Sequence, residues 1–162
     1  MTYVKVEKII FTGKQNIDWK GVERFLRKYN GETYTVQETG DIIQLNDGFA
    51  DEFAGSKYTL QLRGAFAKVK ANISQIIPQL VNTATNRRWI KNKAIKHEGD
   101  ANGGWYRYDV FFAISVKGEK EENERYNKYK GTLLVKKNNR GLFLYDVIDI
   151  KKEARNPGGL CE

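Results

Sequence analysis

One histidine, His97, is the side chain in this sequence best suited to proton transfer. Its unperturbed pKa lies near neutrality, so an imidazole here can serve as a general acid or a general base. It stands in the stretch IKHEGDANGGWYRYDVFF, where a break rich in Gly and Asn separates it from an aromatic segment. The same position also suits a solvent-exposed polar residue of a loop. Both interpretations of His97 stay open at this point.

A basic run, NRRWIKNKAIKH, ends at this histidine and contains no acidic residue. Binding of a single-stranded nucleic acid needs cations for the phosphates and aromatic rings on which the bases stack. The whole chain carries 28 Lys and Arg against 20 Asp and Glu, a net charge of +8. We therefore predict a nucleic-acid-binding surface that includes Arg87, Arg88, Trp89, Lys91, Lys93, Lys96 and, in the next segment, Arg107. The alternatives are a solvated charged face for the run and a core position for Trp89.

Metal and cofactor chemistry is not expected. The only cysteine, Cys161, lies in the Pro- and Gly-rich end EARNPGGLCE, which is a poor setting for a rigidly held nucleophile. With one His and one Cys, the sequence has no ligand spacing typical of zinc sites. No apolar run approaches the roughly 20 residues that cross a bilayer. We expect a soluble, cytoplasmic protein with no membrane partner, no metal and no cofactor.

The elements that must position these residues follow from hydrophobic spacing. Residues 2–12 alternate charged and apolar side chains, which favours a strand, and residues 17–30 show the three- and four-residue spacing of a helix. Asn16 or Asp18 can cap the start of this helix. A hairpin is expected over residues 32–46, with its turn at Thr39–Gly40. A second helical region covers residues 65–85 and is divided by Pro78, which opens its second piece.

The C-terminal half changes to the period of two that is typical of strands. We predict strands near residues 104–117, 131–137 and 141–150, the last two joined by a turn at Asn138–Gly141, with a charged loop or short helix over 119–130. Helices followed by consecutive strands indicate an α+β fold, with the helices packed on one antiparallel sheet. We expect a single domain over residues 1–153 and a flexible tail over residues 154–162.

The alternation near Arg107 leaves two arrangements open. Either Arg107, Asp109 and Phe111 face the binding side and the tyrosines are in the core, or Tyr106 and Tyr108 face outward. We expect Val110, Phe112 and Ile114 to be in the core, with Tyr108 at the edge of a cleft.

The order of several short segments resembles a known family. YNGETYTVQETGDIIQLN, LRGAFAK, the proline-divided QIIPQLVNTA, an aromatic strand and a final YDVIDIKKE together resemble the third class of large polyvalent protein-associated domains. These domains occur in phage and mobile-element proteins and are similar to the barnase, EndoU, colicin and RelE-like ribonuclease-toxin superfamily. The resemblance covers residues 5–153.

The resemblance implies a metal-independent ribonuclease of the toxin type, in which the ribose 2′-hydroxyl attacks the adjacent phosphodiester. This chemistry needs a base, an acid and a cation for the phosphoryl oxygens. Arg63 matches the Arg-Gly element of the family and could hold the phosphate, with Lys68 behind it, whereas its structural alternative is a salt bridge at a helix start. His97, Tyr108 and Lys68 are the candidates for proton transfer.

The partners implied are RNA, with tRNA as one candidate substrate, and an acidic immunity protein or antitoxin. The principal alternative function is a non-catalytic module that binds nucleic acid or protein within a phage or mobile-element protein. A structural adaptor on an acidic partner would use the same basic surface, so charge alone does not separate these classes.

Overall fold

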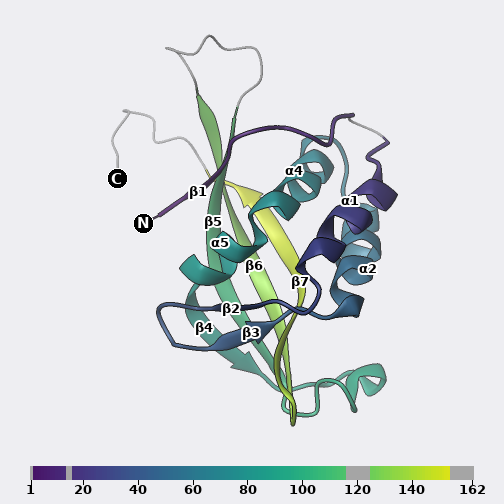
Figure 1. The fold of residues 1–162 in the computed structure, drawn as a ribbon, viewed down its shortest axis with the longest axis vertical. Coiled ribbons are helices and arrows are strands. Elements are labelled where there is room, and N and C mark those ends of the chain that lie inside the picture. The colour runs from purple at the N-terminus through teal and green to yellow at the C-terminus, as the bar shows by residue number, and fades with distance from the viewer. Residues whose placement is uncertain (1, 14–15, 116–124, 154–162) are drawn as a thin grey trace.

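A computed structural model describes residues 2–13, 16–115 and 125–153 of the chain (Figure 1). The expected tail over 154–162, including Cys161, lies outside the described residues. In chain order the elements are β1 (Val4–Val6), α1 (Trp19–Leu26), η1 (Arg27–Tyr29), β2 (Thr33–Thr35), β3 (Ile42–Gln44), α2 (Asp47–Gly55), α3 (Lys57–Gln61), α4 (Ala65–Ile73), η2 (Ser74–Ile76), α5 (Ile77–Thr83), β4 (Thr85–Ile90), η3 (Ile95–His97), β5 (Trp105–Ser115), β6 (Tyr126–Asn138) and β7 (Gly141–Lys152).

The three long strands form the antiparallel meander predicted from the period-two pattern. β5 pairs with β6, and β6 pairs with β7 through a turn between Asn138 and Gly141. The hairpin of β2 and β3 is also antiparallel, as predicted. The fold is therefore α+β.

The expectation of a purely antiparallel sheet is wrong, because the sheet is mixed. Its order is β1-β5-β6-β7-β3-β2, with β4 also pairing β5. β1 runs parallel to β5, and β3 runs parallel to β7. Parallel neighbours need long connections, and these two pairs join strands that lie far apart in the sequence. The short N-terminal strands thus extend the meander at both edges.

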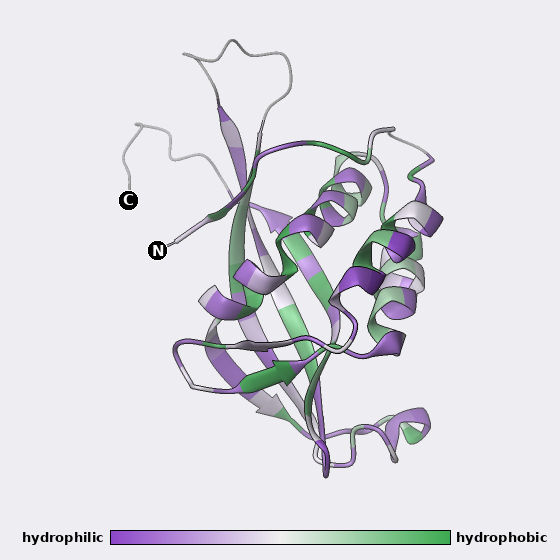
Figure 2. Cartoon of the chain, in the orientation of Figure 1, coloured by the Kyte–Doolittle hydropathy of each residue, from purple (hydrophilic) through white to green (hydrophobic). Residues whose placement is uncertain are grey.

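The helices cover one face of this sheet, on one side of the long strands in Figure 1. Asp18 begins α1 by accepting a hydrogen bond from the backbone N–H of Gly21, and Pro78 lies in the first turn of α5, as predicted. Side chains of α1, α2, α4 and α5 form one core with alternate residues of the strands. Figure 2 shows hydrophilic residues on the visible, outward side of α1, in keeping with its amphipathic pattern.

Four local features differ from the prediction. The first strand is shorter than residues 2–12, because β1 covers only Val4–Val6. Helices α2 and α3 were not predicted; Asn46 and Ser56 cap their N-termini by accepting hydrogen bonds from backbone N–H groups. The start of the basic run forms strand β4. Residues 126–130 of the expected charged loop belong to β6, whereas 119–124 lie outside the described residues.

A buried ion pair in the core links the helical layer to the sheet. Nζ of Lys70 in α4 lies 2.7 Å from Oδ1 of Asp146 in β7, and both side chains are buried. The Lys70 ammonium also donates to the hydroxyl of Thr59. Burial lowers the pKa of Lys70 and raises that of Asp146, while each charge partly offsets the effect on the other.

Candidate nucleic-acid interface

The face of the sheet opposite the helices, termed here the outer face, carries a mixture of basic and aromatic side chains. Because side chains alternate along a strand, the core positions Tyr108, Val110 and Phe112 of β5 require Arg107, Asp109 and Phe111 to point to the outer face. Of the two arrangements left open by the sequence, this is the first. Directly paired residues share a face, so the register places the following residues on the outer face: Arg88, Lys128, Lys130, Thr132, Leu134, Lys136 and Phe143.

At the centre of the outer face lies the carboxylate of Asp109, which is largely buried. Its Oδ1 is 3.0 Å from a guanidinium nitrogen of Arg88, and its Oδ2 accepts a hydrogen bond from the amide of Asn86 at 2.9 Å. Nζ of Lys130 lies 3.8 Å from Oδ2. Arg107, which is paired with Arg88 across the strands, has a buried Nε with no hydrogen-bond partner among the described residues. Arg88 and Lys130 thus contact the Asp109 carboxylate, and Arg107 lies beside Arg88; this group is termed here the Asp109 centre.

One end of the outer face holds an aromatic cluster around His97. Its ring meets Trp105 and Tyr145 edge to face, with centroid distances of 5.0 and 5.2 Å. Nδ1 of His97 lies 2.9 Å from a carboxylate oxygen of Asp100, and Nε2 lies 3.3 Å from the Tyr145 hydroxyl. Lys136 completes the cluster, with its Nζ 3.2 Å from Asp100. His97 is therefore buried and oriented, not the solvent-exposed loop residue that the sequence also allowed.

Electrostatics in this cluster favour a charged Asp100 and a neutral Tyr145. Burial tends to raise the pKa of Asp100, but hydrogen bonds from His97 and Lys136 outweigh it, so the pKa is lowered. Burial, followed by the nearby carboxylate of Glu52, raises the pKa of the Tyr145 hydroxyl. A charged carboxylate at Nδ1 holds the imidazole in place. The cluster has the parts needed for proton transfer.

The opposite end of the outer face has a second aromatic group. Phe111 packs edge to face with Tyr3, at a centroid distance of 5.7 Å, and the ammonium of Lys130 lies 6.0 Å from the Phe111 centroid. Nζ of Lys128 lies 5.0 Å from the Tyr3 ring centroid. Both ends of the outer face therefore combine basic and aromatic side chains, a combination that suits the phosphates and stacked bases of a single-stranded nucleic acid.

The Asp109 carboxylate and the His97 imidazole, the two groups of the outer face suited to proton transfer, are too far apart to act on one phosphodiester. Asp109 and Trp105, which contacts His97, are four residues apart on β5, a separation of roughly 13 Å at the usual strand rise. A base and an acid acting on the same phosphate must each come within hydrogen-bond reach of it. Catalysis would therefore use either the Asp109 centre or the His97 cluster.

Tyr108, a predicted proton-transfer residue, lies on the opposite face of the sheet. The expectation that it stands at a cleft edge is wrong, because its side chain is fully buried beneath the hairpin of β2 and β3. Its hydroxyl donates to Asp41 at 2.7 Å, and Arg87 also binds Asp41 through two contacts of 2.9 Å. Burial and the Asp41 carboxylate raise the pKa of Tyr108. Arg87 and Tyr108 together hold the hairpin on the sheet.

Arg63 and Lys68 lie on the helical side of the molecule, away from the outer face. Arg63 is exposed between α3 and α4, and its guanidinium donates to the backbone carbonyls of Leu60 and Leu62 instead of forming the salt bridge considered from the sequence. It borders a hollow of about 580 Å³ that is also lined by Trp19. Lys68 is half-buried in α4. The structure therefore does not bring Arg63 and Lys68 together with His97.

The residues of the basic run lie in different environments. Arg87 binds Asp41 and Arg88 binds Asp109, whereas Lys91, Lys93 and Lys96 are exposed on the segment after β4. Trp89 is 53% exposed and is not a core residue; its indole N–H donates to the carbonyl of Gly103. Of the basic residues in the run, Arg88 contacts Asp109, and so does the neutral Asn86 at its start.

Several residues of the outer face were not singled out from the sequence. Asp100, Lys130, Lys136, Phe143 and Tyr145 come from three different segments, so no local pattern links them. The one available signal was the alternation in β5, which groups Arg107 with Asp109 and Phe111.

No protein-family model matches the chain, and comparisons with curated proteins and with solved structures give no match. Among the described residues, no group of three or more His, Cys, Asp and Glu side chains is placed to hold a metal ion. No helix in the described part of the chain has the length and apolar character to cross a membrane.

Proposed function

We propose that this chain is a metal-independent ribonuclease domain of the toxin type, from the large polyvalent protein-associated class, and that it binds single-stranded RNA on its outer face. The observation that carries the proposal is the Asp109 centre, where a largely buried carboxylate stands among Arg88, Arg107 and Lys130. Helices on one face of a sheet and a polar, basic opposite face also agree with the barnase-like arrangement that the sequence resemblance implies.

The reaction assigns a role to each group of this centre. The Asp109 carboxylate takes the proton of the ribose 2′-hydroxyl, and the 2′-oxygen forms a bond to phosphorus. The bond between phosphorus and the 5′-oxygen breaks, and the Lys130 ammonium supplies the proton to that leaving oxygen. Arg88 and Arg107 stabilise the negative charge on the phosphoryl oxygens. The products are a 2′,3′-cyclic phosphate and a free 5′-hydroxyl.

Cleavage of labelled single-stranded RNA in the presence of EDTA tests this proposal. Asp109→Asn should lower the cleavage rate by about 10²- to 10⁴-fold, the usual contribution of one proton-transfer group, with little change in RNA affinity. Asp51→Asn, which alters an exposed carboxylate of α2, is the matched control. Thermal melting should confirm that both variants fold.

The His97 cluster is tested in the same assay. If His97→Gln causes the loss of cleavage and Asp109→Asn does not, proton transfer occurs beside Trp105 and not at the Asp109 centre. If both variants cleave as the parent protein does, both assignments are wrong.

A non-catalytic RNA-binding module is the second candidate function. It is favoured by the engagement of Asp109 with Arg88 and Asn86, which leaves this carboxylate less available as a base. RNA binding without cleavage, over a range of salt concentrations and RNA sequences, would support this candidate. An acidic immunity protein or antitoxin remains a proposed partner, which the same basic face would attract; competition between such a protein and RNA would show a shared surface.

A further inference from the structure

A row of side chains crosses the outer face from β5 to β2 at the end near His97. Trp105 pairs with Lys136, Lys136 with Phe143, Phe143 with Gln44, and Gln44 with Thr33. Directly paired residues lie side by side on the same face. A strand of RNA that follows this row would meet two aromatic rings, with one ammonium between them.

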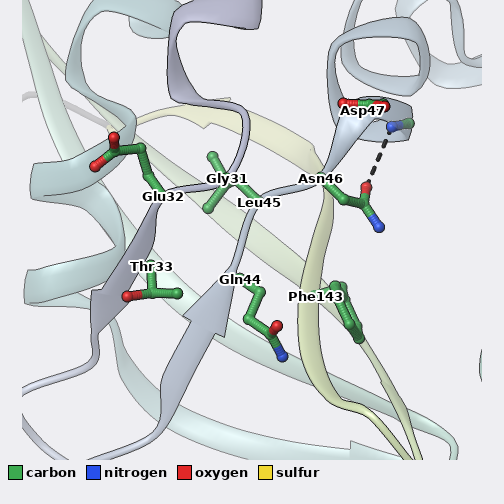
Figure 3. Close-up of a pocket in the computed structure, with 9 residues that line it drawn as sticks. Gly31, Glu32, Thr33, Gln44, Leu45, Asn46, Asp47 and Phe143 are labelled. Atoms are coloured by element: carbon green, nitrogen blue, oxygen red, sulfur yellow. Dashed lines mark hydrogen bonds between the residues drawn. The ribbon is translucent and has the colours of Figure 1, made fainter.

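The row ends in a pocket of about 460 Å³, which is shown in Figure 3. Its wall includes the ring of Phe143 and the side-chain amides of Gln44 and Asn46. Glu32 and Asp47 also line it. The two carboxylates disfavour a phosphate in this pocket, whereas they are compatible with a neutral ring that carries an amine.

The two amides have complementary free groups. Nε2 of Gln44 donates to the carbonyl of Arg140 at 3.1 Å, and Oε1 of Gln44 accepts no hydrogen bond within the described residues. Oδ1 of Asn46 accepts from the backbone N–H of Gly48 at 3.2 Å, which caps α2, and Nδ2 of Asn46 likewise donates to no described residue. The pocket therefore offers one acceptor and one donor next to an aromatic ring.

We infer that this pocket binds one nucleobase of the RNA strand and prefers a base with an exocyclic amine beside a ring-nitrogen acceptor. Adenine and cytosine present this pair, whereas uracil presents a carbonyl oxygen beside a ring N–H. In the bound state the amine donates to Gln44, the ring nitrogen accepts from Asn46, and the base lies against Phe143. Lys136 contacts the adjoining phosphate. This inference rests on the proposed binding of RNA to the outer face, but it does not depend on cleavage.

The test is the affinity of the full chain for short oligoadenylate and oligouridylate of equal length, measured by fluorescence anisotropy. Oligoadenylate should bind about tenfold more tightly, which is within the range for a good pair of base-edge hydrogen bonds. Asn46→Ser keeps a side-chain oxygen for the helix cap but removes the amide donor. It should bring the ratio of the two affinities close to one.

Phe143→Leu should weaken binding of oligoadenylate about fivefold or more, because stacking on an aromatic ring is lost. Phe66→Leu, on the exposed surface of α4, is the matched control and should leave the affinity unchanged. Circular dichroism and thermal melting show whether each variant is folded.

The outcomes separate this inference from the function on which it rests. Equal, salt-dependent binding of both oligonucleotides by the parent protein would overturn the base preference while the outer face remains an RNA site. A preference that survives both Asn46→Ser and Phe143→Leu would show that the base is read elsewhere. Failure of both oligonucleotides to bind would overturn RNA binding itself, and this inference with it.

Discussion

If RNA binds as proposed, the salt dependence of its affinity will show whether the outer face or the exposed part of the basic run is the binding surface. The four cations of the Asp109 centre and the His97 cluster would then contact its phosphates, namely Arg88, Arg107, Lys130 and Lys136. For a single strand, each phosphate contact contributes about −0.7 to the slope of log affinity against log salt, so four contacts give roughly −3. A fourfold rise in salt should then weaken binding about 50-fold.

The perturbation is the double substitution Lys130→Gln with Lys136→Gln. Two contacts remain, so the slope should fall to about −1.4 and a fourfold rise in salt should cost only about sevenfold in affinity. The matched control, Lys91→Gln with Lys93→Gln, removes the same charge from the exposed segment after β4. It should leave the slope near −3.

Fluorescence anisotropy titrations at several salt concentrations, with one labelled RNA, give all three slopes. The placement of RNA on the outer face would be refuted if the control variant, Lys91→Gln with Lys93→Gln, has a flatter slope while Lys130→Gln with Lys136→Gln keeps the slope of the parent protein. The basic run would then be the binding surface, as the sequence pattern by itself suggests.

Three further predictions concern the stability of the fold. Lys70→Met should lower the free energy of unfolding by about 3–5 kcal/mol, because the buried carboxylate of Asp146 loses its partner. Adding Asp146→Leu should restore most of this loss, as measured by urea titrations. A double variant as unstable as the single variant would contradict this account. Gly104→Ala should lower the free energy of unfolding by about 1–3 kcal/mol, because the backbone has φ +90° and a Cβ would lie 2.7 Å from the indole nitrogen of Trp89. Gly99 has open space around it, so Gly99→Ala should leave the free energy of unfolding nearly unchanged. Burial tends to raise the pKa of Asp41, but hydrogen bonds from its neighbours lower it, so its stabilising contribution is present above the unfolded pKa near 4 and is lost as pH falls through the folded value. Asp41→Asn should therefore lose less stability than the parent protein when urea titrations at pH 7 are repeated at pH 3, and an unchanged difference would refute this role.

Local patterns of the sequence were sufficient for the elements whose signals lie within a few residues. The cap at Asp18, the proline of α5 and the turn at Asn138–Gly141 each depend on side chains next to the backbone that they shape. The alternation in β5 also limited the outer face to two possible sets of residues. The class of fold follows from such local signals.

Only the tertiary structure decided which of the two sets of β5 residues faces away from the helices, and which residues meet there. The parallel partners of β5 and β7 come from the N-terminal part of the chain, and no local pattern specifies a pairing across so many residues. The burial of Tyr108 depends on a hairpin that begins more than 60 residues earlier, as its bond to Asp41 across 67 positions shows. The partners of His97 and Asp109 likewise come from segments that are separate in the sequence. Packing of the helices on one face of the sheet turns alternate residues of each strand to the opposite face, where these partners meet.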